Sequence, residues 1–61
     1  MTKAEEFIKN NNLDITKLMT ALDDDYDIKS EQDYENGITT WFFEDKSFIK
    51  IQGMDVETGI N

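Results

Sequence analysis

The chain contains no cysteine, histidine, proline or arginine. Without cysteine, no disulfide can support the fold. Without cysteine and histidine, the common zinc sites are excluded. The lack of histidine also removes the most frequent catalytic base, and the lack of arginine removes the best clamp for phosphate groups. The sequence therefore predicts no metal site, no cofactor and no enzymatic activity.

Long hydrophobic runs are also missing. No apolar run approaches the roughly 18–20 residues that a membrane span needs, and no hydrophobic signal-peptide segment stands near the first residue. We therefore expect a soluble, cytoplasmic protein with no membrane partner. With 61 residues, the chain is expected to form a single small domain, residues 1–61, that is marginally stable and too small to enclose a ligand pocket of about 300 Å³.

What the chain has in excess is negative charge. Fourteen aspartates and glutamates face six lysines, which gives a net charge of −8. Such a body repels nucleic acid and anionic membranes, and it attracts basic surfaces. We therefore expect a basic protein surface as partner and no direct binding to nucleic acid. The alternative is that the charge serves solubility alone.

The first 22 residues carry two helix patterns. Thr2 and Glu5 match a capping box ahead of a helix over residues 3–10, which an Asn10–Asn12 run ends. Asp14 matches the N-cap of a second helix over residues 15–22, with Leu13 and Leu18 as a hydrophobic staple. Apolar residues recur at helical spacing in both segments, at Ala4, Phe7, Ile8, Ile15, Leu18, Met19 and Leu22.

The remainder of the chain is typical of β-structure. We predict strands over residues 26–34, 38–44 and 47–52, with Asn36-Gly37 as a two-residue hairpin turn. Residues 53–61 are expected to add a short strand or to fray. The fold class that follows is α+β, with two short N-terminal helices packed on one face of a three-stranded antiparallel β-meander.

The Asn36-Gly37 turn predicts which residues share a face, because it sets Glu35 opposite Ile38. Trp41 then lies on the apolar face. The next turn leaves two options: an even-length loop places Phe48 beside Trp41, whereas an odd-length loop places Ile49 and Ile51 there. We favour the odd loop, because it gathers more aliphatic volume under the helices. The predicted core is Phe7, Ile8, Leu18, Met19, Leu22, Ile28, Trp41, Phe43, Ile49 and Ile51.

The opposite, outer face is expected to be uncovered, because two helices cannot cover both sides of the sheet. It would present Phe42 and Phe48 beside an acid row of Glu31, Asp33 and Glu35, which alternate along one strand. Alternate residues of a strand lie roughly 6.8 Å apart on one face, so this row can imitate a row of phosphates. The simpler interpretation of such a row is a solvated strand face, and scattered surface aromatics are common.

Four aspartates after the second helix extend the negative surface. Asp23, Asp25 and Asp27 match the opening of an EF-hand loop, but that loop needs Gly and Glu where Ile28 and Tyr34 stand. We therefore interpret them as surface acids. The predicted partner-binding residues are Asp23, Asp24, Asp25, Asp27, Glu31, Asp33, Glu35, Phe42 and Phe48.

The function that follows is a small, acidic, non-enzymatic protein-interaction module. It would bind a basic surface of a larger protein, as an inhibitor or a nucleic-acid mimic, with the size and acidity that small phage proteins often show. The alternative is a self-associating structural protein, in which the outer faces of two copies pack as a homodimer.

Overall fold

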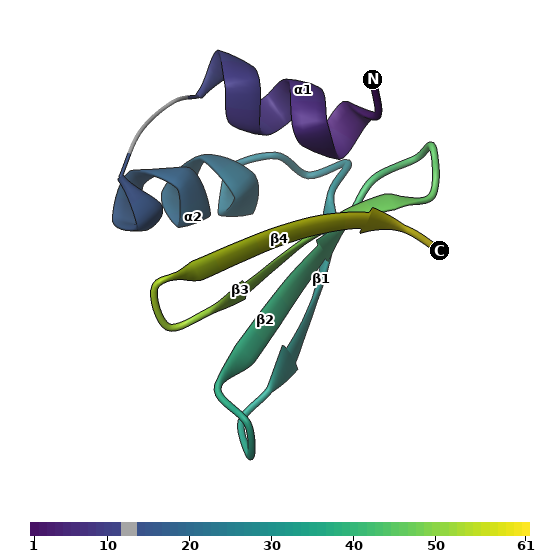
Figure 1. Ribbon diagram of the computed structural model, residues 1–61. Helices are drawn as coiled ribbons and strands as arrows, with labels where there is room; N and C mark the ends of the chain where they lie inside the picture. Colours follow the sequence, from purple (N-terminus) through teal and green to yellow (C-terminus); the bar gives the residue numbers. More distant parts are fainter. Residues whose placement is uncertain (12–13) are drawn as a thin grey trace.

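The computed structural model describes residues 1–11 and 14–61, and within these residues the chain forms two helices and one four-stranded antiparallel sheet. The strands follow one another as a meander in the order β1-β2-β3-β4. Both helices lie on one side of the sheet, and the turn between β1 and β2 projects away from them (Figure 1). The elements are α1 (Lys3–Asn10), α2 (Ile15–Asp23), β1 (Lys29–Asp33), β2 (Ile38–Phe42), β3 (Ser47–Gln52) and β4 (Asp55–Ile60).

Both helices begin at the caps that the sequence predicts. The hydroxyl of Thr2 accepts the backbone N–H of Glu5, whose carboxylate accepts the backbone N–H of Thr2, so the capping box is confirmed. Asp14 caps α2 by accepting the backbone N–H of Lys17 at 2.9 Å. The proposed staple through Leu13 lies outside the described residues. In the described part of the chain, neither helix is long and apolar enough to cross a membrane.

The turn between β1 and β2 differs from the prediction. Ile38 pairs with Asp33, not with Glu35, so the loop holds four residues and not two. The cause is Asp33, whose carboxylate accepts the backbone N–H of Glu35 at 3.2 Å and that of Asn36 at 3.3 Å. The offset is two residues, and side chains alternate with a period of two. The predicted faces are therefore kept.

The ends of these two strands also differ. β1 begins at Lys29 and not at residue 26, because the chain before it forms turns in which Asp25 accepts the backbone N–H of Asp27 and of Ile28. β2 ends at Phe42 and not at residue 44, because the next turn begins at Phe43.

The loop between β2 and β3 is odd in length, as the volume argument favours. Phe43 donates its backbone N–H to the carbonyl of Ser47 at 2.9 Å, which leaves the three-residue loop 44–46. Lys46 closes this loop with a φ of 71°, the left-handed position that three-residue hairpin loops use. Trp41 is paired with Ile49, and Phe42 is paired with Phe48 on the outer face.

The prediction of three strands is wrong, because residues 55–60 form β4 and pair with β3 along its whole length. A turn with Gly53 at φ 60° reverses the chain, and the backbone N–H of Asn61 reaches the carbonyl of Lys46 at 2.8 Å. Of the two options for residues 53–61, a short strand or a frayed end, the structure has the strand.

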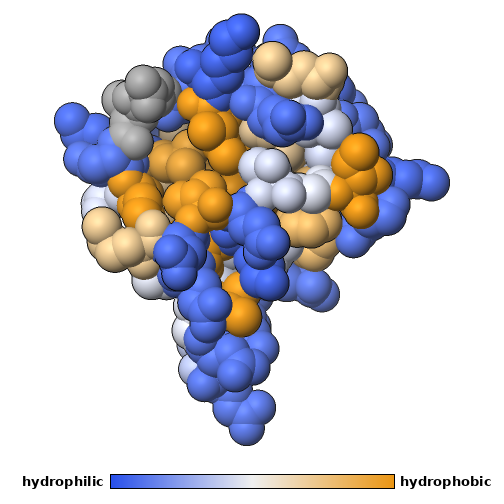
Figure 2. All heavy atoms as spheres, viewed as in Figure 1, coloured by the Kyte–Doolittle hydropathy of each residue, from blue (hydrophilic) through white to orange (hydrophobic). Residues whose placement is uncertain are grey.

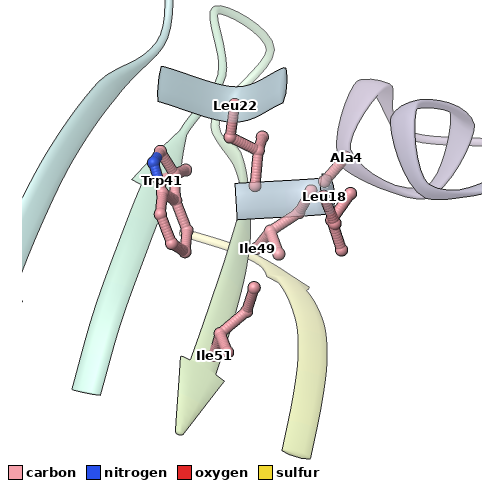
Figure 3. Packing of buried hydrophobic residues seen from close by; sticks show 6 residues of the cluster. All are labelled: Ala4, Leu18, Leu22, Trp41, Ile49 and Ile51. Atoms are coloured by element: carbon pink, nitrogen blue, oxygen red, sulfur yellow. The ribbon is translucent and has the colours of Figure 1, made fainter. Parts of the chain in front are cut away.

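The core lies between the helices and the inner face of the sheet. Its buried hydrophobic residues point toward one another from α1, α2, β2 and β3 (Figure 3); they are Ala4, Leu18, Leu22, Trp41, Ile49 and Ile51. The predicted core residues Phe7, Ile8, Met19, Ile28 and Phe43 are half-buried and pack around this cluster.

The first turn of α1 is hydrogen-bonded to the loop between β2 and β3 and to the first residue of β3; we call this contact the fastening of α1. The backbone N–H of Lys3 donates to Asp45 Oδ2 at 2.8 Å, and that of Ala4 donates to Ser47 Oγ at 3.1 Å. The Ser47 hydroxyl donates in turn to Asp45 Oδ1. Ser47 is fully buried. The donated backbone N–H of Lys3, followed by the Ser47 hydroxyl, lowers the pKa of Asp45 from 3.8 to about 2.

Candidate interaction site

The outer face of the sheet consists of three rows of side chains that cross all four strands. The row nearest the helices contains two phenylalanines, the middle row mixes both charges, and the row nearest the β1–β2 turn contains two aspartates and no lysine. In strand order, these helix-end, middle and tip rows are Lys29, Phe42, Phe48, Gly59; Glu31, Thr40, Lys50, Glu57; and Asp33, Ile38, Gln52, Asp55.

The parts of the middle and tip rows on β1 and β2, together with Lys50 of β3, border an open trough of about 650 Å³. This volume is larger than the sequence led us to expect for so short a chain. The hollow is not an enclosed pocket, because it lies open along the exposed strand β1 and the turn that follows. Its lining residues are Glu31, Gln32, Asp33, Tyr34, Glu35, Ile38, Thr40 and Lys50.

The three predicted acids lie together in this trough, but only Glu31 and Asp33 alternate along β1. The strand ends at Asp33, so Glu35 lies in the turn and not on the strand as predicted. Glu31, Asp33 and Glu35 are all exposed. The side-chain amide of Asn36 donates to Asp33 at 2.8 Å, and this bond, together with the backbone N–H of Asn36, lowers the pKa of Asp33. These bonds also hold the Asp33 carboxylate in place within the turn that it caps.

The lysines of the outer face are placed away from the tip. Lys50 belongs to the middle row, where its ammonium lies 3.7 Å from the carboxylate of Glu57. Lys29 belongs to the helix-end row. The negative charge of this face therefore increases along the strands toward the β1–β2 turn, where Asp33 and Asp55 flank Ile38 and Gln52.

Phe42 and Phe48 contact each other at the other end of the face, with ring centroids 6.4 Å apart. Both are half-buried. The Phe48 ring covers Gly59, where an added Cβ would lie 2.5 Å from Phe48 Cζ. Phe42 borders a separate hollow of about 260 Å³ with Asp27. The structure therefore places the aromatic pair on the predicted face, and the hollow that Phe42 borders is a different one from the trough of the acids.

The predicted aspartates lie at the end of α2 and in the turns that follow it, and two of their carboxylates accept hydrogen bonds. Asp23 accepts the indole N–H of Trp41 at 3.0 Å, and Asp25 Oδ1 accepts the backbone N–H of Asp27 at 3.0 Å. Asp24 is the C-cap of α2. The bond to Trp41 was not predicted, although a buried indole N–H usually requires an acceptor. Among the described residues, no group of three or more acidic side chains is arranged to hold a metal ion.

Two acids of the outer face are not among the predicted site residues. Asp55 and Glu57 lie on β4, and they continue the tip and middle rows to the second edge of the sheet. The signal that could have found them is the alternation of the acids Asp55 and Glu57 with the β-branched residues Val56 and Thr58, which is typical of a strand.

Three comparisons, with protein-family models, with characterised proteins and with solved structures, find no match to this chain.

Proposed function

We propose that this chain is a non-enzymatic protein-interaction module that binds a basic protein surface with its outer face. The observation that carries the proposal is the gathering of Glu31, Asp33 and Glu35 in one open trough beside Ile38. Carboxylates attract lysine and arginine, and an apolar side chain among them adds contact area that does not depend on charge.

The spacing of the acids supports an extended basic ligand. Glu31 and Asp33 are alternate residues of β1, so their side chains leave the same face roughly 6.8 Å apart. A partner segment with arginines at alternate positions of a strand matches that spacing. Guanidinium groups would pair with the carboxylates in the bidentate manner that makes such contacts directional.

Access to the trough also supports the proposal. The β1–β2 turn projects beyond the helices, and Figure 2 shows this end of the molecule as a hydrophilic projection. All five residues of β1 are exposed. A partner can therefore reach the acids without moving a helix, and the negative charge at the tip would steer a basic groove toward it. A groove that normally holds phosphates fits this description, and the module would then act as a nucleic-acid mimic.

The test compares two triple variants that carry the same net charge. Glu31→Gln, Asp33→Asn and Glu35→Gln remove three charges from the trough. Asp24→Asn, Asp25→Asn and Asp27→Asn remove three charges after α2, at predicted site residues that do not line the trough and that the proposal leaves out of the site. Each set changes the net charge from −8 to −5. The probe is a fluorescent peptide with arginine at alternate positions, and the readout is its anisotropy.

We expect the trough variant to weaken peptide binding by about tenfold or more, since exposed charge pairs contribute roughly 0.2–1 kcal/mol each. The variant changed after α2 should weaken it less than about threefold. Wild-type binding should also fall steeply between about 50 mM and 500 mM salt, because the Debye length shrinks severalfold over that range. Equal losses in the two variants, or binding that is independent of salt, would overturn the proposal.

A further inference from the structure

The free edge of β4 has a defined set of unpaired backbone groups. In an antiparallel ladder, residues alternate between those bonded to the neighbouring strand and those whose N–H and C=O face away. Asn61 donates to the carbonyl of Lys46, so residues 55, 57 and 59 bond to β3. The N–H and C=O groups of Val56, Thr58 and Ile60 therefore face outward.

The turn between β2 and β3 leads independently to the same set of bonded residues. Phe43 donates to the carbonyl of Ser47, which assigns residues 47, 49 and 51 of β3 to bonds with β2. Residues 48, 50 and 52 are then the ones that bond to β4, and their partners in the register are residues 59, 57 and 55. Both turns thus identify the same outward-facing groups.

We propose that two copies of the chain pair antiparallel through β4, about a two-fold axis at Thr58, and join their sheets into one of eight strands. In this register Thr58 lies opposite Thr58 of the second copy, and Val56 lies opposite Ile60 of the second copy. Every outward-facing N–H and C=O of the three residues then has a partner. A two-fold axis closes the assembly after two copies.

The side chains fit the same register. Val56 is 40% exposed and Ile60 is 66% exposed, and both lie on the helix side of the sheet. Pairing across the axis brings the two aliphatic side chains together, which is the usual unit of stabilisation between strands. Figure 2 shows the side of the molecule on which β4 lies in front, and hydrophobic side chains gather there between the helices and the strand.

The charges also permit this register. Glu57 lies opposite Gly59 of the second copy, and Asp55 lies opposite Asn61 of the second copy, so no two acids face each other. The lysine that approaches Glu57, Lys50, neutralises part of its charge. The contact therefore avoids directly opposed like charges. The two copies of Glu57 are diagonal neighbours across the axis, roughly 7–8 Å apart, each with its own Lys50 beside it.

The other edge of the sheet does not allow an equivalent contact. On β1 the outward-facing residues are Ser30 and Gln32, because Glu31 bonds toward β2. A two-fold pairing that uses both residues puts Glu31 opposite Glu31 of the second copy, where Cα atoms are only about 4.5 Å apart. Charged residues of this kind protect edge strands from pairing. This difference assigns self-association to β4 and leaves the acid trough free.

Salt separates this proposal from the proposed function. Two bodies of net charge −8 repel each other, and added salt screens the repulsion while the backbone bonds and aliphatic contacts remain. Dimerisation should therefore strengthen with salt, whereas binding of a basic partner should weaken. Each proposal can fail without the other, because one concerns the β4 edge and the other concerns the trough beside β1.

The experiment is sedimentation of the full chain over a concentration series, at about 50 mM and about 500 mM salt. We expect the mass to rise from the 7.1 kDa of one chain toward twice that value, with the midpoint at least about threefold lower in high salt. In the same series, hydrogen exchange of the amides of Val56, Thr58 and Ile60 should slow as concentration rises, and those of Glu57 and Gly59 should be protected throughout.

The sharpest variant is Thr58→Pro, which removes the N–H at the axis and none of the bonds between β4 and β3. Proline is tolerated on an edge strand when the lost N–H faces away from the sheet. We expect Thr58→Pro to remain monomeric at concentrations where the matched control, Thr58→Val, dimerises like wild type. Amide spectra that match wild type outside β4 establish that the proline variant is folded.

A second pair keeps the test decisive if the proline disturbs the strand. Ile60→Asp adds a charge opposite Val56 of the second copy, and Met54→Asp adds the same charge in the exposed turn before β4. Ile60→Asp should raise the dimerisation midpoint at least about tenfold, and Met54→Asp should change it less than about threefold. A chain that stays monomeric at millimolar concentration in high salt, equal effects of the two aspartates, or species larger than dimers would overturn the proposal.

Discussion

The turn at Asp33 and the turn at Asp45 are built with the same chemistry and serve different ends. In each, an aspartate accepts the backbone N–H of the residue two positions later: Asp33 that of Glu35, and Asp45 that of Ser47. The Asp45 turn lies under α1, where its carboxylate also accepts the backbone N–H of Lys3. The Asp33 turn extends past the helices into solvent (Figure 1).

The two turns show how one kind of residue supplies stability in one place and the proposed binding surface in another. The Asp45 carboxylate accepts a backbone N–H from Lys3 of α1, which is distant in the sequence. This carboxylate therefore stabilises the tertiary fold. Around Asp33 the donors come from its own turn, and the neighbouring Glu31 and Glu35 lie exposed in the trough. Substitutions in the part of the sheet that the helices cover (the covered region) should therefore lower the free energy of unfolding. Substitutions in β1 and the turn that follows it (the exposed region) should weaken the proposed binding.

The largest effect is expected from Trp41→Ala. Trp41 is 1% exposed at the centre of the core, and its loss should lower the free energy of unfolding by about 3–5 kcal/mol. The whole domain is expected to have only about 3–9 kcal/mol. Denaturant unfolding measures the change. Tyr34→Ala in the exposed turn, where the side chain is 87% exposed, should stay within about 0.5 kcal/mol. Similar losses in both variants would contradict the division between the covered and exposed regions.

A smaller effect is expected from Ser47→Ala. The variant leaves the backbone N–H of Ala4 without its acceptor in a buried position, which should cost about 1–3 kcal/mol. Ser30→Ala on exposed β1 is the matched control, and it should have almost no effect. Thermal unfolding of the two variants side by side checks the prediction. If Ser47→Ala unfolds at the same temperature as wild type, the hydrogen bond from Ala4 to Ser47 contributes little to stability.

The smallest effect is a difference in acid sensitivity. Because the folded protein holds the pKa of Asp45 at about 2, below its ordinary 3.8, this stabilisation is complete above pH 3.8 and is lost as the pH falls toward 2. Asp45→Asn should therefore have a lower free energy of unfolding than wild type at pH 5. This difference in free energy should shrink as the pH falls from 3.8 toward 2. Chemical denaturation at several pH values measures it; a constant difference would contradict the assignment.

The sequence was sufficient for features that depend on neighbouring residues. The cap residues Thr2 and Asp14 predicted where the helices begin, because a side chain that caps a helix lies within three residues of its target. Alternation predicted the two faces of the sheet. The odd loop followed from volume, since only that choice buries Ile49 and Ile51.

The missed features depend on contacts between distant residues or on competing local bonds. The four-residue turn arose because Asp33 captures two backbone N–H groups, which outweighs the preference of Asn36-Gly37 for a tight hairpin. β4 stayed undecided between a short strand and a frayed end, because a short acidic segment gains strand structure only from its neighbour, β3. The fastening of α1 joins residues more than forty positions apart, and no local pattern reports such a contact.

That fastening also bears on the order of folding. The acceptors for the first turn of α1, Asp45 and Ser47, take their places only when the loop between β2 and β3 has closed. This loop is short and closes quickly, whereas bringing α1 to it requires a larger entropic cost of chain closure. We therefore expect the β2–β3 hairpin to form early in the folding pathway and α1 to dock late, so that α1 is among the first elements to open when the native state fluctuates.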